Sequence, residues 1–547
     1  MNENKNVVIA LLLMLAVWMG FTLLFPPQQT TETTKTVELS ESKASTVQIE
    51  EQATPTEAVL TGQVNAPSSA LEQEAKDFAL DVPARNITIE TSLYRAVLSS
   101  SGARLTSFEL KEFRATADPQ SAMVQLIPGD SLRYATLPTV GTEGFSLPED
   151  APYEVDFIND FVTLVGGESK SIQFRSVTPT GLEVIKTFVF KDGHYSIDLQ
   201  TSIRNQTQGP LTGRLDIALV KYWDDEAERD AYSFAGPATL VNGKVDEVKV
   251  KNLSEEAQTY GREADWTSIQ FKYFLDVVAP LADAIDQISL ARENDRIVNT
   301  LKSPFFTLQP GQAKQLDYFL FFGPKDLEIL KSEGHQLDKN IDFGFFHFLA
   351  KPLLHVLTFF YGYLNNYGLA IILLTVIIKI LFWPLTHKSY ASMKSMQKLQ
   401  PEMQKIRERF KSDKERLNKE LMQLYKENRV NPLGGCLPML VQIPVFFALY
   451  KVLLGSIALR HAPFAFWLTD LSAKDPYYIT PVLMGLSMFV QQKLTPMSAD
   501  PMQAKIMTYL PLVFTFMFLN FPSGLVLYWL VNNLLTIVQQ YFIYRKA

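Results

Sequence analysis

The sequence predicts a multi-domain protein in which an α-helical polytopic membrane bundle of six transmembrane helices is joined to one all-β domain. Three observations support this fold class. Apolar residues make up 47% of the 547 residues, and their long runs lie near the start and in the C-terminal part of the chain. Short runs of alternating polarity, separated by turn residues, occupy the region between them. A strongly basic segment interrupts the C-terminal apolar runs, as expected for a loop on the inner side of a membrane.

The first apolar run, residues 7–25, predicts an N-terminal transmembrane anchor within residues 1–26. It is long enough to cross a hydrocarbon core of about 30 Å as a helix. Lys5 precedes it and no small-residue cleavage site follows it, so we expect an uncleaved anchor with a cytoplasmic N-terminus. Residues 27–67 are rich in Thr, Glu, Gln and Ser and poor in aromatic residues, which predicts a disordered periplasmic linker.

Residues 68–340 predict a periplasmic β-sandwich domain with two packed sheets. The alternating runs include residues 87–89, 94–98, 105–110, 161–165, 171–177, 182–190, 195–203 and 315–322. Turn signals such as Ser101-Gly102 and Asp192-Gly193 separate them.

The C-terminal part predicts a periplasmic interfacial helix followed by a five-helix membrane core. Residues 341–364 contain a short amphipathic segment that Lys351-Pro352 interrupts, which favours a helix lying on the membrane surface. Within residues 365–547, apolar runs predict spans at 367–385, 433–454, 477–490, 506–521 and 525–544. The segment 386–432 holds twelve Lys and Arg against six Asp and Glu, so it is predicted to be cytoplasmic. The C-terminus is then cytoplasmic too.

Lys379 is a cation inside the first core span, where a charge costs about 2.5–3.5 kcal/mol on insertion scales. Thr375 lies one helical turn earlier on the same face. Two interpretations stay open. The lysine either reaches out to the cytoplasmic headgroups, or it lines a water-filled cavity that receives acidic groups of a substrate.

The last span carries a polar stripe on an otherwise apolar helix. Its members recur at helical spacing: Trp529, Asn532, Asn533, Thr536 and Gln540. Further amides, Gln442, Gln491 and Gln492, occur in other spans. They either form hydrogen bonds that hold the helices together or, with Lys379, line a hydrated groove that opens towards the cytoplasm.

The basic segment 386–432 predicts a cytoplasmic helical hairpin. One apolar stripe runs from Tyr390 to Phe410, a second runs from Leu417 to Tyr425, and residues 411–414 form the turn. Tyr390, Lys394, Arg407 and Arg409 are candidate contact residues for anionic lipid, a ribosome, a targeting receptor or a substrate. A hairpin that is merely solvated is the alternative.

Several function classes are disfavoured. The single cysteine, Cys436, excludes an internal disulfide framework. A net charge of −7 gives no global basic field, so we expect no direct binding of nucleic acid. The chain lacks a phosphate-binding loop, a zinc-protease motif and a nucleophile elbow, so we predict no catalytic residues, no metal site and no cofactor.

Several motifs give the chain a family resemblance. The runs 431–438 and 442–444, and the later segments 462–464, 475–478, 500–503 and 521–525, resemble the landmarks of the YidC family of membrane protein insertases. The resemblance implies a five-helix core with a hydrophilic groove open to the cytoplasm and to lipid. It also implies insertion of nascent membrane proteins, alone or with the Sec translocon, and a periplasmic β domain of the mutarotase-type supersandwich class.

The resemblance also assigns residues. The cation of the family's groove is usually an arginine, and Lys379 stands at the matching position, which keeps the charge but loses the planar fork. Thr375 matches the polar neighbour of that cation. Tyr528 and Trp529 match an aromatic pair that faces the substrate. The chain ends without the long basic tail that some members use to dock on ribosomes.

Two functions of other classes are alternatives to an insertase. A small-anion transporter or channel would use Lys379 as its binding site, but inverted repeats are lacking and the intramembrane charge stands alone. A sugar-active β domain would need paired acid–base residues, and only His194 lies well inside the predicted strands. We therefore predict an insertase and not an enzyme.

Overall fold

A computed structural model describes residues 84–545 except 130, 226–232, 255, 283, 412, 429, 431–436 and 495–500. The predicted anchor (1–26), the predicted linker (27–67) and the first residues of the predicted β domain (68–83) lie outside the described residues. So do residues 431–436 of the motif 431–438, among them Cys436.

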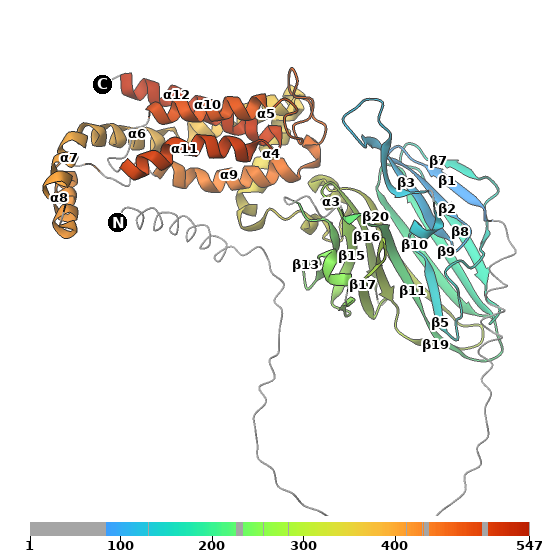
Figure 1. Ribbon diagram of the computed structural model, residues 1–547. Coiled ribbons are helices and arrows are strands. Elements are labelled where there is room, and N and C mark those ends of the chain that lie inside the picture. Colours follow the sequence, from blue (N-terminus) through green and yellow to red (C-terminus); the bar gives the residue numbers. More distant parts are fainter. Residues whose placement is uncertain are drawn as a thin grey trace, which may run out of the picture. The chain divides into compact units, whose positions relative to one another are not determined.

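The β domain contains three sheets (Figure 1). A 5-stranded sheet has the order β4 (Met123–Pro128), β3 (Arg104–Arg114), β2 (Tyr94–Ser99), β1 (Asn86–Glu90) and β7 (Phe161–Thr163). A 9-stranded sheet has the order β13 (Lys244–Glu247), β12 (Gly236–Val241), β15 (Ala264–Gln270), β16 (Phe274–Leu281), β20 (Ala313–Pro324), β10 (Ser196–Asn205), β9 (Leu182–Lys191), β8 (Ser169–Val177) and β6 (Glu154–Val155). A 6-stranded sheet has the order β14 (Gln258–Tyr260), β17 (Gln287–Glu293), β18 (Arg296–Lys302), β11 (Leu211–Tyr222) and β19 (Phe306–Leu308), with β5 (Thr139–Glu143) paired to β11. The prediction of two sheets was therefore wrong, because alternation identifies strands but not their partners.

The strands follow from the period-2 pattern of their residues. In β9, Leu182, Val184, Phe188 and Phe190 are buried and belong to one continuous core with residues of all three sheets. This strand pairs antiparallel with β10 from Ile197↔Phe190 to Asn205↔Leu182. The face that the alternation assigns to the core is thus the face that is buried.

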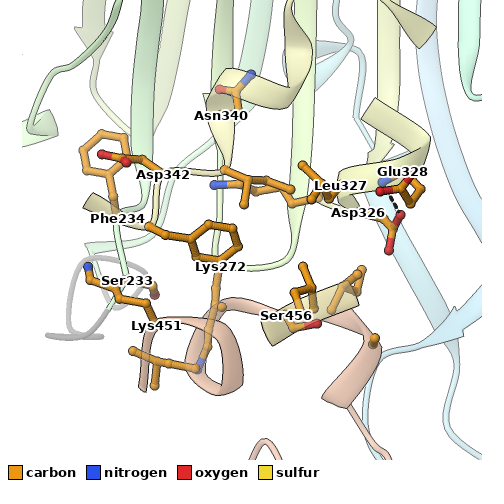
Figure 2. A pocket seen from close by; sticks show the side chains of 18 of the residues that line it. Ser233, Phe234, Lys272, Asp326, Leu327, Glu328, Asn340, Asp342, Lys451 and Ser456 are labelled. Carbon is orange, nitrogen blue, oxygen red and sulfur yellow. Dashed lines mark hydrogen bonds between the residues drawn. The ribbon is translucent and has the colours of Figure 1, made fainter. Parts of the chain in front are cut away.

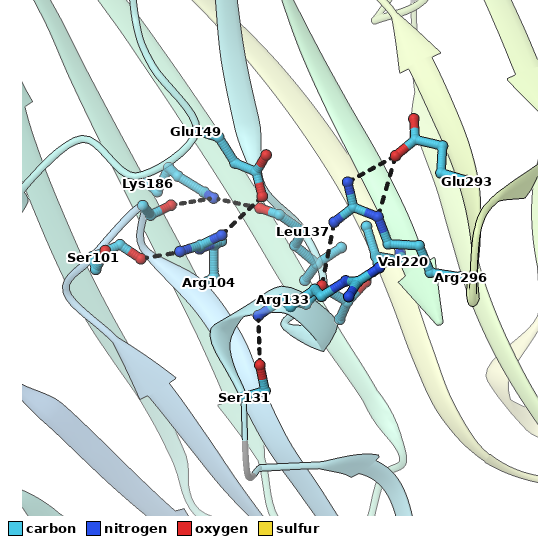
Figure 3. Close-up of polar contacts among 12 residues, drawn as sticks. Ser101, Arg104, Ser131, Arg133, Leu137, Glu149, Lys186, Val220, Glu293 and Arg296 are labelled. Atoms are coloured by element: carbon cyan, nitrogen blue, oxygen red, sulfur yellow. Dashed lines mark hydrogen bonds and ion pairs between the residues drawn. The ribbon is translucent and has the colours of Figure 1, made fainter. Parts of the chain in front are cut away.

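Lys186 is the exception on the buried face of β9, and it is fully buried (Figure 3). Its Nζ donates hydrogen bonds to the carbonyl oxygens of Ala103 at 2.7 Å, Leu137 at 2.9 Å and Gly102 at 3.4 Å. All three acceptor residues have a positive φ, of 45°, 64° and 74° respectively. Lys186 on the 9-stranded sheet thus bonds to the β2–β3 turn and to Leu137, and it stabilises the positive φ of Ala103 and Leu137, a conformation that is unfavourable for residues other than glycine. Burial, with Arg104 nearby, lowers the pKa of Lys186 well below its ordinary value.

The described chain after β20 is mainly helical. Short helices α3 (Leu327–Glu333), η4 (Leu337–Asn340) and η5 (Gly344–Phe346) lead to α4 (His347–Leu364). The remaining helices are α5 (Tyr367–Leu381), α6 (Trp383–Lys398), α7 (Gln400–Arg409), α8 (Lys414–Glu427), α9 (Leu437–Gly455), η7 (Ile457–Leu459), α10 (Ile479–Leu494), α11 (Pro501–Phe518) and α12 (Ser523–Arg545). The β domain adds η1 (Leu132–Tyr134) and η3 (Val250–Ser254). Residues of α4, α5, α9, α10, α11 and α12 share one apolar core.

Two predicted helices are broken near prolines. The predicted span 367–385 is interrupted at Phe382, and α5 and α6 are bent by 64°. The predicted continuous stripe 390–410 is interrupted at Leu399. Pro384 and Pro401 lie in the first turn of the helix that follows each break, where proline is tolerated because its missing N–H is not needed.

The hairpin consists of α7 and α8 alone. Leu399, Met403, Leu421 and Leu424 form a small apolar core with Val430. The two predicted apolar stripes therefore contact each other from Leu399 onwards.

No single helix among the described residues is both long enough and apolar enough to cross a membrane. Taken together, the bent pair α5–α6 has the length and the apolar composition of a span, and shorter apolar stretches lie at Gln442–Gly455 and Met507–Phe518.

Candidate functional site

Lys379 lies on α5 with only 8% of its surface exposed. Its Nζ donates hydrogen bonds to Thr536 Oγ1 at 2.6 Å and to Asn532 Oδ1 at 3.2 Å, both on α12. The Thr536 hydroxyl donates in turn to the Asn532 carbonyl oxygen at 2.7 Å. The ammonium is therefore directed at α12. The headgroup interpretation required it to point outwards.

The acceptors around this ammonium are neutral. Among the ion pairs of the residues that the structure describes, none includes Lys379. A buried cation is ordinarily paired with an acid, because its desolvation is otherwise costly. The site thus holds a positive charge that its own hydroxyl and amide partners solvate but do not neutralise.

A small cavity lies beside the ammonium. Its volume is about 20 Å³, enough for about one water molecule. Residues of α5, α6, α9 and α12 line it: Ile378, Lys379, Phe382, Leu385, Thr386, Gln442, Val445 and Asn532. The structure thus brings Lys379, Gln442 and Asn532 together, in an arrangement that is nearly closed.

Other predicted site residues point elsewhere. Thr375 donates to the Ile371 carbonyl oxygen of its own helix at 2.6 Å. Asn533 donates to Ser487 Oγ of α10 at 3.1 Å. Trp529 packs edge-to-face on Phe446, with ring centroids 4.7 Å apart.

The last two predicted groove residues also lie away from the ammonium. Tyr528 is 2% exposed and belongs to the apolar core, and Gln491 is half-buried on α10. Neither lines the cavity at Lys379.

Two polar residues of this region were missed by the sequence analysis. Gln539 is fully buried and donates from Nε2 to Thr386 Oγ1 at 2.8 Å, which joins α12 to α6. Thr386 was assigned to the hairpin, because the predicted span ended at residue 385. The Trp383-Pro384 pair was the available signal, since a proline there predicts a helix boundary.

The predicted hairpin contact residues fall into two groups. Tyr390 and Lys394 lie on α6, where Tyr390 is buried and Lys394 Nζ donates to the Ile543 carbonyl oxygen of α12 at 3.2 Å. Arg407 and Arg409 lie on α7, and the Arg409 guanidinium is 5.6 Å from the ring of Phe410. The first group belongs to the bundle and the second to the hairpin.

A larger cavity, of about 250 Å³, contains none of the predicted site residues (Figure 2). Its lining includes three cations and four acids: Lys272, Lys325, Lys451, Glu247, Asp326, Glu328 and Asp342. Burial lowers the pKa of Lys325 to about 8, although the Glu247 carboxylate partly offsets this effect. The mixture of charges favours neither anions nor cations.

Comparison with known proteins places the chain in a class. Residues 86–356 match the family described as YidC periplasmic domain, and residues 359–547 match the family described as 60Kd inner membrane protein. The chain is therefore an inner-membrane protein with a periplasmic β domain and a C-terminal helical region.

Individual relatives narrow this class. The membrane protein insertase YidC of Geotalea uraniireducens is 44% identical over 544 residues, covering 99% of both chains. That of Syntrophus aciditrophicus is 42% identical over 555 residues, covering 100% of both chains. A crystal structure of an active YidC insertase with its first transmembrane domain resolved overlaps 87% of this chain and 98% of its own, at 17% identity and a TM-score of 0.36. The chain belongs to the YidC family of membrane protein insertases, which confirms the resemblance and the predicted insertase function.

Proposed function

We propose that the chain inserts nascent membrane proteins through a groove centred on Lys379, into which an acidic, polar segment of the substrate enters first. One observation carries this proposal. The Lys379 ammonium is buried against two neutral oxygens and, within the described residues, has no acid as a partner. A carboxylate of the substrate would form an ion pair with the ammonium, which adds an attraction between opposite charges that the two neutral oxygens do not provide.

The groove has to widen for this step, since the cavity at Lys379 holds about one water molecule. Gln442 and Asn532 then supply further polar contacts on α9 and α12. Burial of about twenty apolar residues of the substrate drives the transfer, because each leucine-like residue contributes a few tenths of a kcal/mol on insertion scales. The other predicted groove residues contribute to this path through the packing of the helices around it: Thr375, Tyr528, Trp529, Asn533 and Gln491.

The proposed topology has six spans with both termini in the cytoplasm. The first is the N-terminal anchor, the bent pair α5–α6 begins the five-helix core, and residues 27–67 tether the β domain. Helix α4 lies at the periplasmic surface, which is supported by its two faces. Ala350, Leu353 and Leu357 are buried, whereas Phe348 and Phe359 are exposed.

The proposed partners are the Sec translocon, anionic lipid, and a ribosome or targeting receptor. The α7–α8 hairpin is the candidate surface for anionic lipid and for a ribosome or targeting receptor. Arg409 is exposed there, and the segment 386–432 has an excess of basic residues.

Charge reversal at Lys379 tests the groove. The probe is a single-span protein with an aspartate-bearing tail, added to phosphatidylethanolamine–phosphatidylglycerol vesicles that contain the full chain. Lys379→Glu should reduce its insertion about 100-fold, because juxtaposed like charges cost several kcal/mol, whereas Lys379→Arg should preserve it.

Two controls separate this effect from a general loss of function. Lys493→Glu reverses an exposed charge near the end of α10 and should leave insertion unchanged. A probe with asparagines in place of the aspartates should respond weakly to Lys379→Glu. Equal insertion of the acidic probe by Lys379→Glu and Lys379→Arg would refute the electrostatic role.

A further inference from the structure

The loop between α9 and α10, residues 456–478, is bonded to the first residues of α12. Ser523 N donates to the Ala473 carbonyl oxygen at 2.7 Å, and Gly524 N donates to that of Leu471 at 2.9 Å. Ser523 Oγ donates to the Asp470 carbonyl oxygen at 2.8 Å. Two backbone bonds and a fully buried hydroxyl thus fix the start of α12 to this loop.

The same loop holds the start of α5. Asn366, whose side chain caps α5 at Leu369 N, donates from Nδ2 to the Phe464 carbonyl oxygen at 2.9 Å. The Phe464 ring lies so close to Gly368 that a Cβ added there would be 2.0 Å from a ring atom. Only glycine allows this approach, so the contact is both polar and tightly packed.

Two carboxylates complete the attachment. Asp475 is 1% exposed, and its Oδ2 accepts from Thr480 N and Thr480 Oγ1, both at 2.7 Å, at the start of α10. Asp470 Oδ1 accepts from His461 N at 3.1 Å and Ser472 N at 2.8 Å, which closes the loop on itself. The beginnings of α5, α10 and α12 are therefore joined through one short segment.

The contacts at the other end of these helices are of a different kind. There Lys379 bonds to Thr536, Gln539 to Thr386, and Lys394 to the Ile543 carbonyl oxygen. Each of these bonds involves a side chain, whereas two of the bonds between the loop and α12 join backbone groups. The buried Gln539 Oε1 also has no partner in the described part of the chain. Side chains that can exchange one polar partner for water or substrate separate at less cost than buried backbone groups that would be left unpaired.

From this asymmetry we infer that the 456–478 loop is a clamp, which holds the starts of α5, α10 and α12 fixed while the groove opens by separation of α5 and α6 from α12 at the Lys379 end. Asp470 and Asp475 are its positioning residues. The inference rests on the proposed groove at Lys379, to which it adds the segment that stays fixed while the groove opens.

Crosslinking at the two ends tests the clamp in the full chain, with Cys436→Ser as the background. Lys474 and Pro522 face each other in a β-bridge, so Lys474→Cys with Pro522→Cys places two thiols within disulfide range at the loop end. Thr386→Cys with Gln539→Cys places two at the other end. Each pair is joined by a short rigid thiol crosslinker, and a long flexible crosslinker on the same pair is the matched control.

The short crosslink at the loop end should leave insertion of the acidic-tailed probe unchanged. At the Thr386–Gln539 end it should reduce insertion to the level of vesicles without protein, and the long crosslinker should restore it. Block by the short crosslink at the loop end, or full insertion with the short crosslink at the other end, would overturn the clamp.

Spin labels provide a readout that simple loss of stability would not produce. Ile380 and Val538 are exposed near the Lys379 end, and Leu369 and Val482 are exposed near the loop. Binding of the probe should lengthen the first distance and leave the second unchanged; equal lengthening of both would overturn the clamp. The spin-label distances are compared in the chain that retains Lys379, whereas the electrostatic proposal is tested by the difference between Lys379→Glu and Lys379→Arg, so failure of the clamp and failure of the electrostatic proposal are distinguishable.

Discussion

Replacement of Lys186 by methionine tests whether a buried ammonium holds the β domain together. Methionine fills a similar volume but donates no hydrogen bond, so the carbonyl groups of Ala103 and Leu137, which accept at 2.7 and 2.9 Å, lose their donor. A buried polar group left unsatisfied costs about 1–3 kcal/mol. For two such carbonyls, and with the weak 3.4 Å contact to Gly102 neglected, Lys186→Met should lower the free energy of unfolding by roughly 2–6 kcal/mol.

Thermal unfolding of the full chain in detergent, followed by near-ultraviolet circular dichroism, measures this loss. For a domain of this size each kcal/mol shifts Tm by about 2–4 °C, so a shift of roughly 4–24 °C is expected. Lys191→Met removes an exposed lysine from the same strand and should change stability by less than about 0.5 kcal/mol. If both variants melt with the wild type, the three carbonyl groups do not depend on the ammonium and the reasoning is refuted.

Three further predictions concern the described residues. Hydrogen bonds from Ser92 and Gly167 hold the pKa of Asp192 at about 2, below its ordinary 3.8, so its contribution is present above that ordinary value and is lost as the pH falls through about 2. Asp192→Asn should abolish this part of the acid loss in melting curves recorded at decreasing pH. Lys221→Met should lower the free energy of unfolding by about 3–5 kcal/mol, because it leaves the buried Asp276, which Lys221 Nζ contacts at 2.6 Å, without its cation. In chemical unfolding, the double variant Lys221→Met with Asp276→Leu should recover most of this loss. At Gly485 a Cβ would lie 1.8 Å from Thr515 Oγ1, so Gly485→Val should separate α10 from α11 and lower stability by about 1–3 kcal/mol. Size-exclusion yield in detergent should fall for Gly485→Val and not for Gly455→Val, since nothing lies within 4 Å of that Cβ.

The strands of the β domain were predictable from the sequence because alternation is a local property. The predicted runs 87–89, 94–98, 182–190 and 315–322 all lie in strands of the structure. The partners of these strands were not predictable, because pairing joins distant residues. Lys186 shows why: its acceptors Ala103 and Leu137 lie 83 and 49 positions away along the chain.

The candidate site was predictable where a single residue broke the pattern of its own helix. Lys379 and Asn532 were identified as polar residues in apolar spans, and the structure brings them together. Helical spacing placed Asn533 in the same stripe, but its side chain reaches Ser487 on another helix. Thr386 was missed because its place beside Lys379 depends on the 64° bend between α5 and α6, and the degree of a bend is not encoded in periodicity.

A lone cation explains how the proposed groove can be both stable and receptive. An aspartate in place of Asn532 would pair with Lys379, and a substrate would then have to break a buried ion pair, a step that costs about 3–5 kcal/mol when one partner is removed. With Thr536 and Asn532 as acceptors, an entering carboxylate replaces bonds from the ammonium to two neutral oxygens by an ion pair, which adds the attraction between opposite charges. The displaced Thr536 hydroxyl keeps its own bond to the Asn532 carbonyl oxygen, so little is left unsatisfied. The neutral partners thus solvate the ammonium in the resting protein without competing for the charge that the proposed substrate supplies.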